Sequence, residues 1–480
     1  MRNSIMLHGI MLFINRAEEL QRLDALARRR GGGLAVVYGR RRIGKTRLLL
    51  EWIGRHRGLY TVADTSTADV QRRYFALAVQ EKLPGFGDVD YRDWPTLLSH
   101  LARAAHQARW RGPIVFDELP YLVQSTPSFP SILQRWIDHE ARDAALVIAL
   151  AGSSQRMMQG LVLAGNAPLY GRAREVLDVL PLDPNHLRQA FRSATPVERV
   201  GYYAAWGGVP RYWELASDET GSLPQRVERL VLDPRGPLHR EPDRLLLEEM
   251  PSALEARPVL DAIGGGAHRV SEIAGRLGRP ATSLTRPLDR LVQMALVRRE
   301  VPFGDSERSS KRSLYRIDDP FFRLWFRTVA PHRGALAAGS SRTRTQIFER
   351  HWDGLLGIAW EDLCRRAIPR LDGDSALARL GPWGPASRWW SGNLPEWDLV
   401  SGSTDGKYLL LGEAKYRARA LDAPAVAEAL RNIQHRPPPA LGTAWSERTI
   451  IRALFVPQVG GRQRAREEND FVMTATDLGL

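Results

Sequence analysis

Apolar and polar positions in the first 250 residues predict buried strands joined by helices. Short apolar runs, at Leu34–Tyr38, within Gly112–Leu122 and at Ala145–Ala151, are typical of strands that are covered on both faces. Before the first run, three leucines at helical spacing predict an amphipathic helix: Leu20, Leu23 and Leu26. We therefore expect a parallel α/β sheet with helices on both faces at 11–185, followed by a helical segment at 186–250.

The pattern changes after residue 250, where two further modules are expected. Helical stretches at Arg257–Ile263 and Ser271–Leu277, then a longer helix, precede two β segments with a polar tip. Residues 251–331 therefore have the element order of a winged helix-turn-helix. Gly, Ala and Ser residues at 332–345 predict a linker. At 346–480, a long helix, strands and a further helix predict a second α/β domain.

Composition narrows the class of protein. The 480 residues are 44% hydrophobic and 25% charged, which is ordinary for a globular protein. Cys364 is the single cysteine, so a disulfide framework and a thiolate metal site are excluded. No apolar run approaches the roughly 18 residues of a membrane span, and no cleavage site follows the start, where Met6 and Met11 are alternative initiators. We expect a cytoplasmic protein without a membrane partner.

The first strand runs directly into GRRRIGKT, which has the spacing of a phosphate-binding loop. Inward-facing backbone amides would surround a β-phosphate, and the following helix would direct its positive end at the anion. The loop residues expected to do so are Gly39, Arg42, Ile43 and Gly44. Lys45 is placed to reach the β- and γ-phosphates, and the Thr46 hydroxyl to ligate Mg²⁺. The motif predicts that the chain binds a nucleoside triphosphate.

Acidic and hydroxyl residues follow the later strands of the same domain. Asp117 and Glu118 end an apolar strand, where Asp117 would hold the magnesium water shell and Glu118 would polarise the attacking water. Ser153, at the tip of another strand, either senses the γ-phosphate or belongs to an ordinary turn. Arg172 or Arg174 is a candidate arginine finger, acting in cis or from a neighbouring subunit of a homo-oligomer.

These motifs together resemble the archaeal-type ATPases of the STAND/AAA-like branch of the P-loop NTPases. The resemblance rests on FINR, GRRRIGKT, VFDELPYL, LAGSS, PLYGR and GGVPRYW, and it runs from about Met11 to the C-terminus. It implies that the nucleotide is ATP, that Asn15 and Arg16 lie near the adenine, and that Gly208-x-Pro210 is a lid motif. It also implies slow hydrolysis that drives a conformational switch. The residues alone indicate a magnesium-dependent nucleoside triphosphate hydrolase.

Positive charge is most concentrated in the winged-helix segment, where residues 251–334 carry 15 basic against 9 acidic side chains. This balance favours contact with duplex DNA. The residues expected at the phosphates are Thr282, Thr285, Arg286, Arg290, Arg308, Lys311 and Arg312. The alternative is a rigid module that contacts the ATPase. Pro287 either kinks its helix or marks the first turn.

A candidate second site lies in the C-terminal α/β domain. Glu413 and Lys415 are two apart on one strand and therefore share a face, and a hairpin turn returns Asp398 toward them. Two carboxylates can hold Mg²⁺ for phosphodiester hydrolysis, with the lysine positioning or deprotonating water. Four tryptophans that cluster in this domain are expected in its core: Trp383, Trp389, Trp390 and Trp397.

This domain also resembles the restriction-endonuclease-like PD-(D/E)xK domain that the same ATPases carry. The resemblance implies metal binding by Asp398 and Glu413, a catalytic Lys415, and Glu361 as the helical acid. Glu396 directly follows the proline and is a rival ligand. The sequence thus predicts an ATP-hydrolysing regulatory protein acting on DNA, whose ATP state gates a metal-dependent nuclease-like site. The alternative is a STAND-type signalling or scaffolding switch without cleavage.

Overall fold

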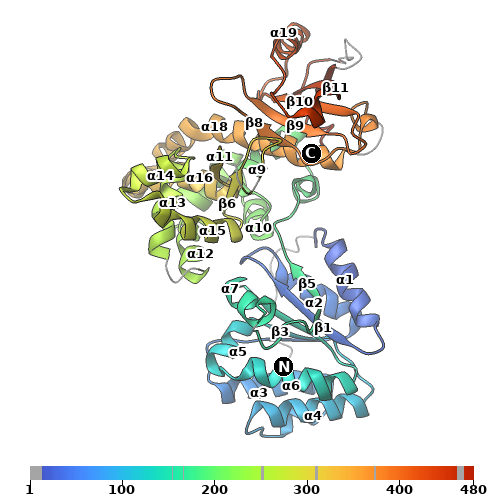
Figure 1. Cartoon of the computed structure of the whole chain (residues 1–480). Coiled ribbons are helices and arrows are strands. Elements are labelled where there is room, and N and C mark those ends of the chain that lie inside the picture. The colour runs from blue at the N-terminus through green and yellow to red at the C-terminus, as the bar shows by residue number, and fades with distance from the viewer. Residues whose placement is uncertain are drawn as a thin grey trace. The chain divides into compact units, whose positions relative to one another are not determined.

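The computed structural model describes residues 13–153, 155–165, 167–249, 253–306, 308, 312–371, 375–461 and 470–480. Met6, Met11 and Lys311 lie outside these residues. The chain divides into two compact units, each described by itself below (Figure 1). Of the described residues, the N-terminal unit comprises 13–182 together with Val209–Arg211, and the C-terminal unit comprises those of Asp183–Gly208 and Tyr212–Leu480.

The N-terminal unit is built on a five-stranded parallel sheet in the order β2-β3-β4-β1-β5. Its strands are β1 (Gly33–Tyr38), β2 (Leu59–Val62), β3 (Ile114–Asp117), β4 (Val147–Gly152) and β5 (Ala173–Asp178). Because every pairing is parallel, the carboxyl ends of all five strands meet at one edge. β4 lies between β1 and β3, so the residue that follows β4 is placed between those that follow its two neighbours.

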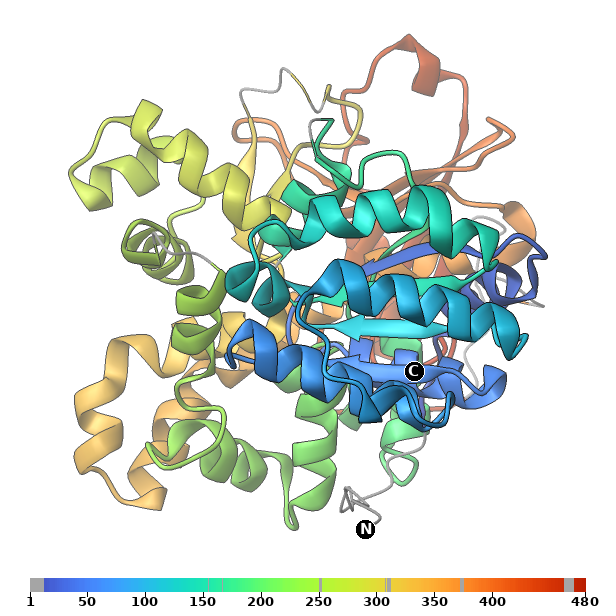
Figure 2. The same cartoon turned by 90° about the horizontal axis from the view of Figure 1, so that it is seen from below.

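Helices cover both faces of this sheet, as the sequence predicted (Figure 2). They are α1 (Ala17–Arg28), α2 (Lys45–His56), α3 (Ala68–Gln80), α4 (Trp94–Gln107), α5 (Leu119–Ser125), α6 (Phe129–Trp136) and α7 (Gln155–Met158). Successive β1 residues point to opposite faces. Val36 packs with the buried residues of α3, α4 and α6, whereas Val37 packs with those of α1 and α2. The predicted leucine stripe of α1 is buried in the second cluster.

Helices occupy much of the C-terminal unit. Those before the long helix α18 are α8 (Leu187–Ala190), α9 (Pro196–Trp206), α10 (Pro210–Asp218), α11 (Leu223–Val227), α12 (Glu241–Glu249), α13 (Ala253–Gly264), α14 (Val270–Leu277), α15 (Thr285–Gln293), α16 (Pro320–Thr328) and α17 (Arg333–Ala338). An antiparallel hairpin of β6 (Val297–Glu300) and β7 (Leu314–Ile317) follows α15, in the predicted element order. Pro287 lies in the first turn of α15, where its missing N–H has no intrahelical partner to lose.

The prediction of a linker at 332–345 was wrong, because this segment is largely helical. Its alanines favour the helix α17, whose Leu336 is buried. Ser340 then caps the next helix, and its Oγ accepts a hydrogen bond from the Thr343 N–H at 3.3 Å. The small residues that suggested a linker therefore form one helix and the start of another.

A mixed sheet forms the C-terminal part of the second unit, in the order β12-β11-β10-β9-β8. Its strands are β8 (Ser387–Trp389), β9 (Trp397–Gly402), β10 (Tyr408–Ala414), β11 (Thr449–Phe455) and β12 (Asp470–Met473). The pairs β8–β9 and β9–β10 are antiparallel, and β10–β11 and β11–β12 are parallel. The sequence did not predict β12. The four tryptophans are buried, as predicted.

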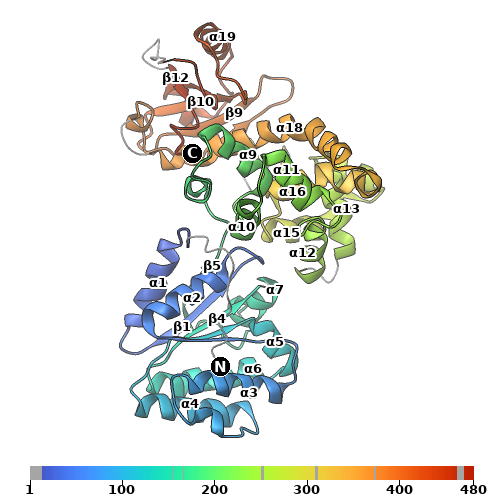
Figure 3. The same ribbon diagram turned by 180° about the vertical axis from the view of Figure 1, so that it is seen from behind.

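Two helices lie on opposite sides of this sheet (Figure 3). They are α18 (Ser341–Ala367) and α19 (Ala423–Gln434), and the short α20 (Thr443–Ser446) precedes β11. The 27 residues of α18 span about 40 Å. The Trp360 indole N–H on α18 donates to the Phe455 carbonyl at 3.0 Å, which anchors the helix to the end of β11. Among the described residues, none of the helices is long and apolar enough to cross a membrane.

Candidate nucleotide and metal sites

The loop after β1 closes around the ammonium group of Lys45. Lys45 Nζ donates to the carbonyls of Gly39 at 2.7 Å and Arg40 at 3.1 Å, and the side chain is 6% exposed. Gly39 has φ 143°, and a Cβ there would lie 2.5 Å from the Val179 carbonyl oxygen. Gly44 and Arg42 also have positive φ, at 92° and 68°. A compact cation inside a loop that precedes a helix N-terminus fits a chain of phosphates.

Oxygen ligands for a divalent cation meet beside this loop. Thr46 Oγ1 donates to Asp117 Oδ2 at 2.9 Å, although the two residues are 71 positions apart in sequence. The Glu118 N–H donates to Asp117 Oδ1 at 2.8 Å and fixes the carboxylate. A hydroxyl and a carboxylate are hard ligands, so this pair fits Mg²⁺ with part of its water shell.

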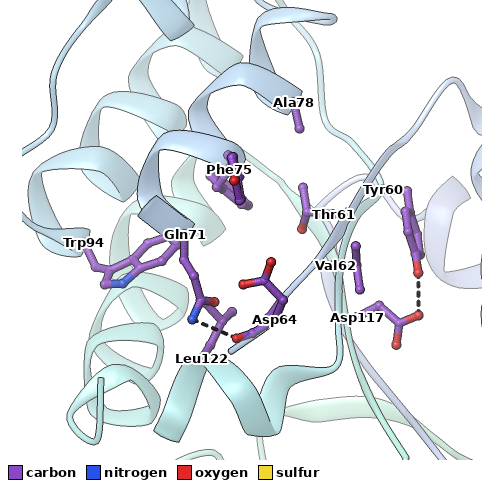
Figure 4. A pocket seen from close by; sticks show the side chains of 12 residues that line it. Tyr60, Thr61, Val62, Asp64, Gln71, Phe75, Ala78, Trp94, Asp117 and Leu122 are labelled. Carbon is purple, nitrogen blue, oxygen red and sulfur yellow. Dashed lines mark hydrogen bonds between the residues drawn. The ribbon is translucent and has the colours of Figure 1, made fainter. Parts of the chain in front are cut away.

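Tyr60 is a site residue that the sequence did not reveal. Its phenol, on the edge strand β2, donates to Asp117 Oδ2 at 2.6 Å (Figure 4). Burial, together with the charge of Asp117, raises the pKa of Tyr60, so the phenol stays a hydrogen-bond donor. It borders a cavity of about 300 Å³ between β2 and α3, which Gln71 and Phe75 also line. A tyrosine in a short apolar strand looks like a core residue, so no sequence signal marked this role.

Glu118 and Ser153 come together at the carboxyl edge of the sheet. Ser153 Oγ donates to Glu118 Oε2 at 2.9 Å, because β4 brings its following residue beside the end of β3. Glu118 has φ 51°, in the left-handed region, and its side chain is half-buried. A carboxylate oriented by a hydroxyl next to the metal ligands can polarise a water molecule.

The Arg16 side chain binds the backbone of the phosphate loop. Its Nη2 donates to the carbonyls of Ile43 at 2.9 Å and Leu180 at 2.7 Å, and its Nη1 pairs with Glu19 at 2.9 Å. Burial lowers the pKa of Arg16, and Glu19 opposes that shift. Asn15 is exposed. The structure thus directs Arg16 to the loop backbone, and its expected proximity to adenine stays a prediction.

Pro210 lies next to the phosphate loop. A Cβ built on Gly44 would be 3.7 Å from Pro210 Cγ. Val209–Arg211 group with the N-terminal unit, although the residues on either side belong to the other unit. This position fits the lid motif that the resemblance implies.

The structure does not bring Arg172 to the phosphate loop. Arg172 forms a two-pronged ion pair with Asp138, with Nε and Nη2 each 2.8 Å from a carboxylate oxygen. It precedes β5, whose first residue Ala173 pairs with Leu34 at the opposite end of β1 from the loop. Five strand residues, about 16 Å, separate the two ends. Arg174 lies at this same end, near Gly33. Neither arginine is placed to act in cis, and action from a neighbouring subunit stays a prediction.

The sheet register of the C-terminal unit brings its candidate acids together. Gly412 pairs with Leu399 in the antiparallel ladder, so Asp398 and Glu413 are the next residues in register. Asp398 Oδ2 accepts a hydrogen bond from the Ala414 N–H at 3.0 Å. Burial, then the charges of Glu361 and Glu413, raise the pKa of Asp398 to about 6.

Basic side chains surround these acids. Lys415 Nζ lies 3.8 Å from Glu413 Oε1, and Arg436 pairs with the other Glu413 oxygen. Arg388 pairs with Glu396 at 2.9 Å and lies 4.0 Å from Glu361.

In the described part of the chain, no group of three or more His, Cys, Asp or Glu side chains is placed to hold a metal ion. The pair Asp398 and Glu413 fits a two-carboxylate site, whereas the rival Glu396 is mostly exposed and held by Arg388.

The residues expected at DNA divide into two groups. Thr282, Thr285, Arg286 and Arg290 are exposed around the start of α15, and Arg308 is exposed in the hairpin loop. Arg312 differs, because it pairs with Asp305 and donates to the Trp390 carbonyl at 3.0 Å. Its guanidinium is committed to contacts within the protein, so the expectation of a phosphate contact there is not supported.

The sheet order, the glycine loop and the Thr46–Asp117 pair define the class of P-loop nucleotide hydrolases. Residues 13–225 match a family of ATPase domains found predominantly in Archaea, and residues 325–426 match DUF234, described as archaeal and bacterial proteins of unknown function. The chain therefore carries an ATPase domain of the archaeal type followed by a DUF234 region.

Three proteins from Archaea are similar to parts of this chain. An uncharacterized protein of Methanocaldococcus jannaschii is 27% identical over 414 residues, covering 85% of this chain and 88% of the relative. An uncharacterized ATP-binding protein of the same organism is 40% identical over 47 residues, covering 10% of this chain and 80% of that protein. A Walker-type ATPase of Pyrococcus abyssi is 20% identical with a TM-score of 0.48, covering 65% of this chain and 96% of that one.

Proposed function

We propose that the chain binds and hydrolyses Mg-ATP, and that the nucleotide state gates a metal-dependent nuclease-like site that acts on duplex DNA. The observation that carries the first part is the convergence of Lys45, Thr46, Asp117 and Glu118 at one edge of a parallel sheet. In the proposed organisation, 11–185 is the ATPase core and 186–250 a lid.

Each residue of the ATPase site has a separate task. Bound Mg-ATP supplies the phosphoanhydride bond and a cation that neutralises phosphate charge. Lys45 exchanges its two loop carbonyls for phosphate oxygens, and Thr46 with Asp117 holds the cation and its waters. Glu118 accepts a proton from the attacking water, in an orientation that Ser153 maintains.

The proposed nuclease-like site uses the acids of the C-terminal sheet. Asp398 and Glu413 would hold a divalent cation, and Lys415 would orient the water that attacks a phosphodiester. The pKa of Asp398, raised by burial and then by the charges of Glu361 and Glu413, supports this role, because a bound cation would stabilise the ionised carboxylate. Residues 346–480 would then form a restriction-endonuclease-like domain.

DNA contact is proposed for the preceding segment. Residues 251–331 would act as a winged helix-turn-helix, with the exposed Arg286 and Arg290 on α15 at the phosphates. Replacing both by Gln should weaken duplex binding and reduce its salt dependence. Unchanged affinity and salt slope would remove α15 from the interface.

A signalling or scaffolding switch without cleavage is the second candidate. The observation that favours it is the ion pair between Arg436 and Glu413, which occupies a carboxylate that a metal would need. In that case the ATPase would change the conformation of the chain, and the C-terminal domain would bind a partner.

One cleavage assay separates the two candidates. The purified chain is incubated with plasmid and linear DNA, Mg²⁺ or Mn²⁺, with and without ATP. Lys45→Ala and Asp398→Ala are compared with Glu428→Gln, which neutralises an exposed acid on α19. Cleavage that Asp398→Ala abolishes and Lys45→Ala alters supports the gated nuclease. Absence of cleavage by the folded chain under every condition favours the switch.

A further inference from the structure

We propose that the C-terminal unit contains a second anion-binding site, which takes a phosphate-bearing ligand of nucleotide size or smaller. The site is a cavity of about 240 Å³ formed by the end of α13, the strand β7 and the helices α16 and α18. Five arginines line it, with two histidines and no acidic residue: Arg298, Arg316, Arg323, Arg327 and Arg350. This site does not depend on the function proposed above.

Three of the arginines form the floor of the cavity, where carboxylates hold their guanidinium groups in place. Asp362, which is 1% exposed, accepts from Arg298 at 2.7 Å and from Arg323 at 2.6 Å. Arg316 pairs with Glu300 at 3.1 Å. Because these carboxylates lie behind the cavity wall, the guanidinium groups are held in place before any ligand arrives.

The other two arginines provide charge that the protein does not neutralise. Arg327 donates to the Gly264 carbonyl at 3.1 Å. Within the described residues, neither Arg327 nor Arg350 forms an ion pair with a carboxylate. His351 also lines the cavity, and burial together with the positive charge of His332, Arg327 and Arg350 lowers its pKa. Arg327 and Arg350 therefore give the cavity a net positive charge, beside three arginines that carboxylates hold in place.

These features select the chemistry of the ligand. Planar guanidinium groups pair with two oxygens of a phosphate at once, so a cluster of them favours a phosphate monoester or a pyrophosphate group. Ile263, Leu355 and Ile358 add apolar wall for a ring or a short chain. The cavity is too small for a nucleic-acid duplex. The phosphate therefore belongs to a free nucleotide or to the end of a single strand.

The cavity floor is also connected to the acids of the C-terminal sheet. Asp362 accepts from Arg365 at 2.9 Å, and the other Arg365 terminal nitrogen donates to the Asp398 carbonyl at 2.9 Å. Two hydrogen-bonded residues thus separate the cavity arginines from the Asp398 backbone. A ligand that orders these arginines would therefore act on the segment that carries Asp398 through Asp362 and Arg365.

Calorimetric titration tests the site in the full chain with Lys45→Ala, which removes the phosphate-loop lysine. The probes are sodium pyrophosphate and AMP. Arg327→Gln with Arg350→Gln should weaken binding about tenfold or more, because two charge-assisted contacts are lost. The control is Arg279→Gln with Arg342→Gln, which removes the same charge from exposed positions outside the cavity and should leave affinity unchanged. An equal loss of affinity in the two double variants would overturn the proposal. So would the absence of saturable binding in the Lys45→Ala chain that is their parent.

A second variant fills part of the cavity and leaves its arginines unchanged. A Cβ at Gly354 on α18 meets no atom within 4 Å, so Gly354→Leu fits the helix and projects into the cavity that Gly354 lines. Leucine also favours a helix more than glycine does, so the substitution is compatible with α18, and circular dichroism checks that the variant is folded. Retained pyrophosphate affinity would contradict the assignment.

Oligonucleotides identify the source of the phosphate. Single strands with a 5′-phosphate are compared with AMP, and 5′-hydroxyl strands serve as the control. If the phosphorylated strand binds more tightly than AMP, the ligand of the cavity is the end of a strand. If AMP binds more tightly, the ligand is a free nucleotide. Equal affinity for phosphorylated and hydroxyl strands, unaffected by Arg327→Gln with Arg350→Gln, would refute recognition of a terminal phosphate.

Discussion

Replacing Asp398 by Asn should make the chain more stable at neutral pH while it removes the proposed metal site. Asp398 is half-buried, and burial with the charges of Glu361 and Glu413 raises its pKa to about 6 from an ordinary value of 3.8. The folded state therefore holds this proton more tightly than the unfolded state. Stability is lost as the pH rises from about 3.8 to about 6, and the loss is complete above that range.

The magnitude follows from the size of the pKa shift. Two units at about 1.4 kcal/mol each give about 3 kcal/mol of destabilisation by the ionised carboxylate above pH 6. Asn has nearly the same shape, carries no charge, and its carbonyl oxygen can still accept from the Ala414 N–H. Asp398→Asn should therefore raise the free energy of unfolding by up to about 3 kcal/mol at pH 8, and by much less near pH 4.

Urea denaturation in EDTA at both pH values measures this difference. Glu428→Gln, at an exposed position on α19, controls for the change in net charge and should behave like the parent. Adding Mg²⁺ or Mn²⁺ at pH 8 should stabilise the parent more than Asp398→Asn, because a ligand stabilises the state that binds it and only the parent keeps the Asp398 site. A variant no more stable than the parent at pH 8, or equally stabilised at both pH values, would refute the reasoning.

Three further substitutions test other parts of the structure. Asp362→Ala removes the buried carboxylate that Arg298, Arg323 and Arg365 share and should lower the unfolding free energy by about 3–5 kcal/mol, measured with urea; a loss below about 1 kcal/mol would contradict a stabilising role for this network. Tyr60→Phe removes one hydrogen bond to Asp117 and should slow ATP turnover about fivefold without unfolding, and an unchanged rate would dismiss this role. Arg16→Gln should weaken ATP binding about tenfold in a fluorescence titration, whereas parent-like affinity would show that the loop needs no such support.

The ATPase site was largely predictable because its chemistry depends on local sequence. A strand, glycines with positive φ and a lysine at a helix start must be consecutive, so Gly39 to Thr46 could be recognised directly. Asp117 could be added because it ends an apolar strand. Arg172 could not be placed, because its neighbourhood in sequence does not show that it precedes a parallel strand and so lies at the opposite edge of the sheet.

Long-range contacts account for most of what the sequence missed. Tyr60 reaches Asp117 only because β2 pairs with β3, and nothing in its own segment distinguishes it from a core residue. The register that pairs Asp398 with Glu413 depends on the turn geometry between β9 and β10. The basic cavity draws its arginines from β6, β7, α16 and α18, segments whose meeting no local pattern reveals.

Titration with a fluorescent ATP analogue tests the central claim most directly. The account predicts saturable binding that requires Mg²⁺, is abolished by Lys45→Ala and is weakened by Asp117→Ala, because these residues meet at one sheet edge. Circular dichroism establishes that each variant is folded. Saturation that is independent of Mg²⁺ and unaffected by Lys45→Ala, or no saturation by the folded parent, would contradict it.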